Sequence, residues 1–193
     1  VEFAIMGEAF ARAVNGLARP SVALLNVGAE EQKGHEEIRA AAQLIRDTGV
    51  DLNFQGFVEG DDISKGAADV VVTDGFTGNI ALKTGEGAAR LVGQFLREAL
   101  TGGVMAKLGS ARGYSALKKL SQRVDPGTFH GALFLGLNGL VVKSHGSANG
   151  AGFAAAIGVA EKLARSHYRE EIAHNLRRLA SAHAETAKVG DAG

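Results

Sequence analysis

The chain has 193 residues, of which 27 are Gly and 2 are Pro, and it contains neither Cys nor Trp. The lack of cysteine excludes disulfides, cysteine-ligated metal sites and a cysteine nucleophile. Because 21 basic side chains balance 21 acidic ones and 46% of the residues are hydrophobic, the composition favours a globular domain over a disordered chain or a nucleic-acid-binding protein. There is no run of about 18 apolar residues and no secretion signal at the start, so a cytoplasmic protein is expected.

Apolar residues recur at spacings that predict alternating helices and strands. Residues 21–28 are mostly apolar and lie between Pro20 and a glycine, which is typical of a strand buried on both faces of a parallel sheet. In residues 36–49, acidic side chains in the first turn and Arg46 near the end agree with a helix dipole. In chain order we expect a helix at 2–15, a strand at 21–28, a helix at 36–49, a strand at 52–58, a connector or helical turn at 61–68, a strand at 69–75, a helix at 80–100, a looser helical region at 101–124, a hairpin or two strands within 131–146, and one long helix at 152–179.

This alternation predicts an α/β layered domain with a mostly parallel sheet. Residues 184–193 are expected to form a frayed tail. In such sheets, ligands bind beyond the carboxyl ends of the strands. Three polar, glycine-rich loops lie at strand ends of this kind, and they are the expected places for chemistry: residues 26–35, 73–83 and 143–150.

The first loop runs from Asn26 to Gly34 and leads to a predicted helix start, where free backbone N–H groups favour an anion. Lys33 adds a positive charge beside these groups, whereas Glu36 and Glu37 occupy part of the same field. An ordinary loop with a solvated lysine is the alternative interpretation.

The second loop brings two hydroxyls, a carboxylate, an amide and an ammonium to a strand-to-helix corner: Thr73, Asp74, Thr77, Asn79 and Lys83. Asn79 and Lys83 are four residues apart, so on a helix they face the same way. Gly78 lets the backbone approach a ligand closely. Alternatively, Thr77 or Asn79 caps the helix, and both interpretations can hold at once.

The third loop contains Ser144, His145 and Ser147. A histidine among hydroxyls can donate a hydrogen bond to an oxyanion or carry a proton near neutral pH. A purely structural histidine is the alternative.

A fourth segment is apolar rather than polar. Leu100, Val104, Met105 and Leu108 recur at helical spacing, and a pair of lysines follows at positions 118 and 119. Such a stripe can lie in a membrane interface, pack on a second subunit or belong to the core, and the sequence leaves these alternatives open.

The common nucleotide-binding, zinc-protease and hydrolase motifs are absent from the sequence, and its histidines show no metal-ligand spacing. Three stretches nevertheless carry a family resemblance through their sequences and their order: RPSVALLNVGAEEQKG at 19–34, ADVVVTDGFTGNIALK at 68–83 and GALFLGLNGLVVKSHGS at 131–147. Together with FAIMGEAFARAVNG at 3–16, they resemble the bacterial phosphate acyltransferase family, the acyl-acyl-carrier-protein:phosphate acyltransferases (PlsX), over nearly all of residues 1–180. Members are longer and open with a Met-Gly-Gly-Asp type loop, so residues 1–183 are expected to be the C-terminal portion of one acyltransferase domain.

The resemblance implies a three-layer α/β/α sandwich, similar to isocitrate dehydrogenase and phosphotransacetylase. It implies a homodimer that attaches peripherally to the inner membrane through an amphipathic region, which maps onto residues 98–124. The implied reaction moves a long-chain fatty acyl group from acyl carrier protein to inorganic phosphate, giving acyl phosphate for phospholipid synthesis. No cofactor, metal or nucleic-acid partner is expected.

Residue roles follow from the same resemblance. Phosphate is assigned to Lys33, the 28–34 loop and Asn79, with Lys83 and Asp74 orienting Asn79 and the phosphate. Asp74 is also a candidate to accept a phosphate proton, and His145 to donate to the oxyanion. Small residues of the three loops are expected to contact phosphate or substrate: Asn26, Gly28, Gly34, Thr73, Thr77, Gly78, Ser144 and Ser147. The alternatives are a short-chain phosphotransacetylase that uses acetyl-CoA, and a non-catalytic fragment that only dimerises or docks on membrane and carrier protein.

Overall fold

The computed structural model describes residues 1–101, 131–144, 146 and 148–190, and it describes only the backbone for 99–101 and 182–190. The chain divides into two compact units. The first consists of Val1–Thr73, Leu135–Leu140 and Ala160–Gly193, and the second of Asp74–Phe134 and Val141–Val159.

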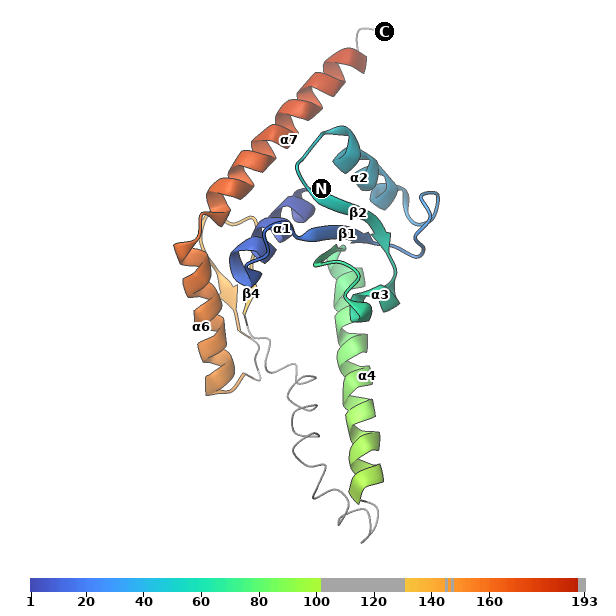
Figure 1. Cartoon of the computed structure of the whole chain (residues 1–193), viewed down its shortest axis with the longest axis vertical. Coiled ribbons are helices and arrows are strands. Elements are labelled where there is room, and N and C mark those ends of the chain that lie inside the picture. The colour runs from blue at the N-terminus through green and yellow to red at the C-terminus, as the bar shows by residue number, and fades with distance from the viewer. Residues whose placement is uncertain (102–130, 145, 147, 191–193) are drawn as a thin grey trace. The chain divides into compact units, whose positions relative to one another are not determined.

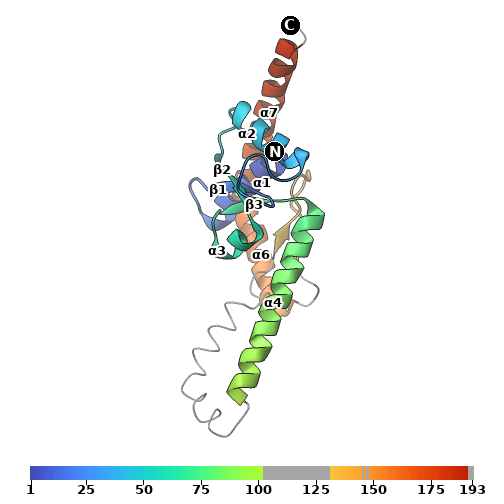
Figure 2. The same ribbon diagram turned by 90° about the vertical axis from the view of Figure 1, so that its right-hand side faces the viewer.

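The first unit is built on a parallel sheet of three strands, in the order β2-β1-β3 (Figures 1 and 2, with β3 labelled in Figure 2). The strands are β1 (Ser21–Leu25), β2 (Asn53–Val58) and β3 (Val70–Val72). Helix α2 (Glu36–Asp47) connects β1 to β2, and α3 (Gly60–Lys65) connects β2 to β3. The structure thereby confirms the predicted α/β class with a parallel sheet.

Burial of the central strand explains why its sequence is continuously apolar. Val22 and Ala23 of β1 are fully buried, as expected for a strand covered on both faces. Val22 shares one hydrophobic core with Ile5 of helix α1 (Glu2–Asn15) and Ile45 of α2. Strand β2 has an irregular register between its pairs with Val22 and Leu24, and there Gly56 adopts a φ of 89°.

Helix α1 lies next to β1 and β3 and also contacts α7 (Tyr168–Gly190); both views of the ribbon show it beside β1 (Figures 1 and 2). Its close approach to the sheet depends on Gly7, because a Cβ atom at this position would lie 2.8 Å from Cγ1 of Val70. Arg169 of α7 donates a hydrogen bond to the carbonyl oxygen of Asn138 at 2.6 Å, which holds the 135–140 segment in the first unit.

In the second unit, β4 (Ala132–Leu133) and β5 (Val142–Lys143) pair antiparallel, which agrees with the hairpin of the two alternatives expected within 131–146. Gly131 has a φ of 116°, and its Cβ would lie 3.2 Å from the backbone of Ala156 in α6 (Gly150–Arg165). The helix therefore packs closely on the start of β4.

Two predicted helix boundaries are wrong. The long helix α4 (Gly75–Thr101) begins five residues before the predicted start, because Asp74 caps it. The predicted single helix at 152–179 is two helices, α6 and α7. Ser166 separates them, since both its backbone N–H and its hydroxyl donate to the carbonyl of Leu163, at 3.2 and 2.9 Å.

Two further observations concern the extent and the character of the helices. Helix α7 extends to Gly190, so the residues expected to begin a frayed tail at 184 have helical backbone as far as 190. Among the described residues, no helix combines the length and the apolar character needed to cross a bilayer.

Candidate functional site

The first candidate loop, and Thr73 at the start of the second, follow strands at the carboxyl edge of the parallel sheet. Leu24 pairs with Val72, so the residues that follow β1 and β3, beginning with Asn26 and Thr73, leave the same edge of the sheet. Glu59, which follows β2, lies at this edge as well and begins the capping box of α3.

Lys33 provides the positive charge of the first loop, residues 26–34, hereafter the Lys33 loop. Its Nζ atom lies 2.7 Å from Oε1 of Glu30, and both side chains are about half exposed. The hydrogen bond and charge of Glu30 raise the pKa of Lys33, and the more distant Glu59 adds to this effect. Lys33 is therefore an ammonium at neutral pH, as an anion-binding residue must be, but an internal carboxylate already pairs with it.

Asn26 is buried at the start of the same loop, with 7% of its surface exposed. Its side-chain amide donates hydrogen bonds to the carbonyl oxygens of Gly28 and Lys33. The structure thus directs this predicted substrate-binding residue toward its own loop.

The second loop is organised by Asp74. Its Oδ1 atom accepts hydrogen bonds from the backbone N–H groups of Phe76 and Thr77, each at 2.8 Å, and its carbonyl accepts from Gly78 at 3.0 Å. The helix cap is therefore Asp74 rather than the predicted Thr77 or Asn79. Hydrogen bonds from the side chain and the backbone of Thr77 lower the pKa of Asp74, and the hydrogen bond from the backbone of Phe76 adds a smaller effect. This carboxylate is consequently a weaker base than an ordinary aspartate.

Asn79 and Lys83 lie within the first three turns of α4, and both are exposed. Their spacing of four residues places them on one face of the helix, as predicted. They belong to the second unit, whereas Lys33 and Thr73 belong to the first.

The third loop follows β5. Ser144 is partly buried, and its Oγ atom is buried with no hydrogen-bond partner among the described residues. A buried hydroxyl of this kind is available to a bound polar group. At the far end of the loop, Oδ1 of Asn149 accepts from the N–H of Gly152 at 2.9 Å and caps α6. His145 and Ser147 lie outside the described residues.

Most of the predicted membrane or partner segment also lies outside the described residues, including Val104, Met105 and Leu108. Leu100 is in the last turn of α4, where only the backbone is described.

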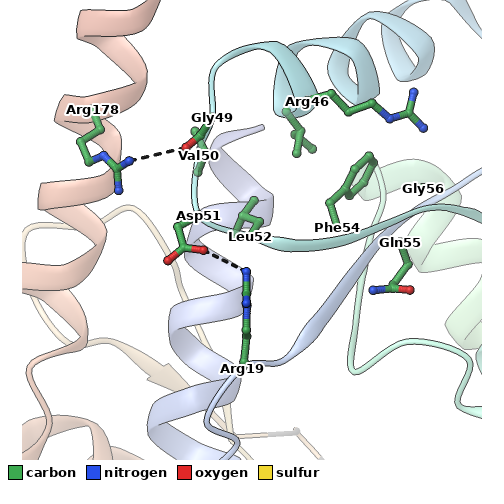
Figure 3. A pocket seen from close by; sticks show the side chains of 11 residues that line it. Arg19, Arg46, Gly49, Val50, Asp51, Leu52, Phe54, Gln55, Gly56 and Arg178 are labelled. Atoms are coloured by element: carbon green, nitrogen blue, oxygen red, sulfur yellow. Dashed lines mark hydrogen bonds and ion pairs between the residues drawn. The ribbon is translucent and has the colours of Figure 1, made fainter.

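A groove of about 690 Å³ occupies the opposite, amino edge of the sheet, where sequence analysis predicted nothing (Figure 3). Arg19 precedes β1 and pairs with Asp51 at 3.1 Å, and Arg178 of α7 donates to the carbonyl of Gly49 at 3.5 Å. Arg46 lies over the ring of Phe54, 5.7 Å from its centroid. These residues come from separate segments of the chain, so no local motif could have revealed the groove.

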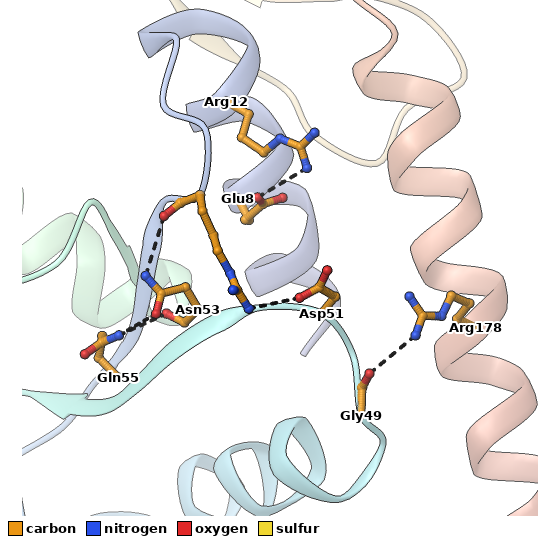
Figure 4. A network of polar contacts seen from close by, with 8 residues as sticks. Glu8, Arg12, Gly49, Asp51, Asn53, Gln55 and Arg178 are labelled. Carbon is orange, nitrogen blue, oxygen red and sulfur yellow. Dashed lines mark hydrogen bonds and ion pairs between the residues drawn. The ribbon is translucent and has the colours of Figure 1, made fainter.

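Close to the groove, Figure 4 shows the ion pair of Glu8 and Arg12 within α1 beside the polar contacts of the segments that precede and begin β1 and β2. Glu8 is only 5% exposed and lies 3.7 Å from Arg12, which also reaches Glu171 of α7 at 3.4 Å. Burial raises the pKa of Glu8, Arg12 opposes the rise, and the charges of Glu171 and Asp51 add to it.

Comparisons with the sequences of known proteins place this chain in a family. A sequence model described as "Fatty acid synthesis protein" matches residues 1–171. The chain is 57% identical over 191 residues to a phosphate acyltransferase of Caulobacter vibrioides, covering 99% of this chain and 53% of that protein. It is 57% identical over 182 residues to a phosphate acyltransferase of Maricaulis maris (94% and 52%), and 53% identical over 179 residues to one of Parvibaculum lavamentivorans (93% and 50%). The chain spans about half the length of these relatives. Since the match extends over most of its residues, the chain belongs to the fatty acid synthesis protein family.

Proposed function

We propose that the protein carrying this chain transfers a long-chain fatty acyl group from acyl carrier protein to inorganic phosphate. The product is an acyl phosphate for phospholipid synthesis. The observation that carries this proposal is the identity of 57% to a phosphate acyltransferase over nearly the whole chain. The ammonium of Lys33 on a loop at the carboxyl edge of the sheet supplies a group suited to phosphate.

The chemistry requires positioning more than proton transfer. A phosphate oxygen attacks the thioester carbonyl, a C–O bond forms, and the C–S bond breaks with release of the carrier thiolate. In this proposal Lys33, the backbone of its loop and Asn79 hold the phosphate, and Lys83 orients it. Asp74 helps indirectly, by capping the helix that carries Asn79 and Lys83.

The developing oxyanion needs a hydrogen-bond donor. His145 has this role in the proposal, and the buried hydroxyl of Ser144 is a second donor beside it in sequence. Because phosphate attacks directly, no acyl group is attached to the enzyme, which agrees with a chain that contains no cysteine.

The proposal includes a cytoplasmic homodimer that associates peripherally with the inner membrane through residues 98–124. The apolar stripe at 100–108 and the following lysines support this association, since such a segment suits a membrane interface. Flotation of the full-length protein with vesicles of anionic lipid, with and without residues 98–124, tests it.

The choice of acyl donor tests the activity itself. The full-length protein is incubated with phosphate and either long-chain acyl carrier protein or acetyl-CoA, and acyl phosphate is trapped with hydroxylamine. We expect product from the long-chain donor. Product from acetyl-CoA alone would assign a short-chain phosphotransacetylase, and product from neither donor would support a non-catalytic docking role.

A further inference from the structure

We propose that Asn26 is a positioning residue, which fixes the Lys33 loop for phosphate without touching phosphate itself. This inference rests on the proposed function, because it gives the Lys33 loop the phosphate. Asn26 follows β1 directly, and its backbone N–H donates to the carbonyl of Val58 at 2.9 Å. The parallel pairing of β1 with β2 therefore continues to the residue from which the loop departs.

The side chain of Asn26 ties together the two ends of the loop. Its Nδ2 atom donates to the carbonyl oxygen of Gly28 at 3.2 Å and to that of Lys33 at 3.0 Å. A primary amide has two N–H hydrogens, and both contacts lie within the loop. Since Asn26 is only 7% exposed, these bonds replace the water that would otherwise solvate the amide.

Gly34 closes the loop around this amide. It has a φ of 85°, which favours glycine, and a Cβ at this position would overlap Oδ1 of Asn26 and lie 2.7 Å from its Cγ. The side-chain amide of Asn26 thus fills the space that any other residue at 34 would need. The two residues fit each other, and a change at either one disturbs the same contact.

This geometry argues against direct binding of phosphate by Asn26. Both amide hydrogens are committed to loop carbonyls, and the remaining polar atom is an oxygen that packs against Gly34. A carbonyl oxygen is an acceptor only, so it repels a phosphate dianion. The effect of Asn26 on phosphate must therefore pass through the backbone of Lys33, to which it is bonded.

The side chain of Lys33 is held in place by the same loop. It crosses over Gly28, where a Cβ would collide with the lysine chain and lie 3.2 Å from Nζ. Because Asn26 bonds to the carbonyls of both Gly28 and Lys33, it sets the backbone positions from which this packing arises. A displacement of about 1 Å at a binding group can reduce a rate 100-fold, so a loosened loop affects phosphate use strongly.

Asn26→Asp tests the inference in the full-length protein, because it keeps the shape of the side chain and removes the two donors. Gly34→Ala disturbs the same contact from the other side. Asn53→Asp is the matched control. Asn53 lies at the opposite end of the neighbouring strand, and the hydrogen bond from its side-chain amide to the carbonyl of Arg19 is long, at 3.5 Å.

Steady-state kinetics and hydrogen exchange are measured on all three variants. We expect Asn26→Asp and Gly34→Ala to raise the KM for phosphate about ten-fold or more and to leave the KM for the acyl donor within about two-fold. Backbone amides of residues 28–34 should exchange faster in both variants, whereas those of β1 and β2 should keep their rates. Asn53→Asp should match the wild type in both measurements.

Three results would overturn the inference. One is an unchanged phosphate KM in Asn26→Asp; another is an equal rise of both KM values. The third is faster exchange throughout β1 and β2, which would make Asn26 a residue of general stability. If the wild-type protein forms no acyl phosphate, the proposed function fails independently of this inference. Hydrogen exchange with and without phosphate then decides the inference. It stands if phosphate protects residues 28–34 in the wild type and not in Asn26→Asp, and it is rejected otherwise.

Discussion

Within the Lys33 loop, Nζ of Lys33 and Oε1 of Glu30 form an ion pair, 2.7 Å apart. Glu30 therefore occupies part of the space and charge that a phosphate would use. In the proposed function, phosphate competes for Lys33 with a carboxylate three residues away in the same loop. This relationship predicts that Glu30 sets the affinity for phosphate.

Replacing Glu30 with Gln should lower the KM for phosphate by about two- to five-fold, the effect expected from an exposed ion pair, and leave kcat nearly unchanged. The difference should shrink at high ionic strength, because salt screens exposed charges. Initial rates over a range of phosphate concentrations, at low and high salt, measure both effects. A rise in the phosphate KM would mean that Glu30 holds Lys33 in its binding position instead of competing for it.

Asp74 should make the stability of α4 dependent on acid pH. Hydrogen bonds from Thr77 and Phe76 lower the pKa of Asp74 in the folded protein. The carboxylate therefore stabilises the fold fully above the pKa of an ordinary aspartate, about 3.9, and this stabilisation is lost as the pH falls through the lower pKa of the folded protein. Asp74→Ala should lower the Tm at pH 6. Asp74→Ser retains a capping oxygen that does not titrate, so it should lose less Tm than the wild type between pH 5 and pH 3. Equal losses in the two proteins would contradict the capping account.

Glu8 should have the opposite pH dependence. Because burial raises its folded pKa, its contribution to stability is complete below the ordinary glutamate value of about 4.3 and is lost as the pH rises through the folded value. Glu8→Gln is neutral at every pH. Urea unfolding should therefore show this variant gaining stability relative to the wild type between pH 4 and pH 7. A relative loss over this range would show that the ion pair with Arg12 outweighs the cost of burial.

Gly7 should resist a substitution that normally stabilises helices. Gly→Ala inside a helix gains about 0.5–1 kcal/mol, but at Gly7 the new Cβ would lie 2.8 Å from the stiff side chain of Val70, and overpacking costs about 1–3 kcal/mol. Gly7→Ala should therefore destabilise the protein. Gly158→Ala in α6 should stabilise it, since no described atom other than those of the adjacent residues and the helix's own backbone lies within 4 Å of the new Cβ. Chemical denaturation of the two variants tests the difference in sign.

The sequence predicted the parallel strands well because their signals are local and strong. A continuous apolar run after Pro20 marks β1, and three successive valines mark β3. The burial of both faces of β1 explains why polar residues do not alternate with apolar ones in it. The break at Ser166 escaped prediction because the residues around it keep a helical pattern. At the break, both the backbone N–H and the hydroxyl of Ser166 donate to the carbonyl of Leu163, a local arrangement that hydrophobic spacing does not reveal.

The candidate site was less accessible to sequence reasoning. The sequence placed Asn26 and Lys33 in one loop, but a list of polar residues cannot tell a side chain that meets a ligand from one that bonds to its own backbone. The side chain of Asn26 bonds to the loop carbonyls of Gly28 and Lys33, and its place depends on the absence of a side chain at Gly34. The cap at Asp74 illustrates the same limit, since any of three nearby residues could have served.

The decisive measurement concerns phosphate at Lys33 and Asn79. Acyl phosphate formation from long-chain acyl carrier protein is compared among the full-length wild type, Lys33→Ala, Asn79→Ala and Lys65→Ala, with folding checked by circular dichroism. Lys65 is the matched control, because it is an exposed lysine that pairs with Asp61 at 2.7 Å just as Lys33 pairs with Glu30. We expect a loss of about 100-fold or more for Lys33→Ala and for Asn79→Ala, and wild-type activity for Lys65→Ala. Activity within a few-fold of the wild type in both site variants would contradict it.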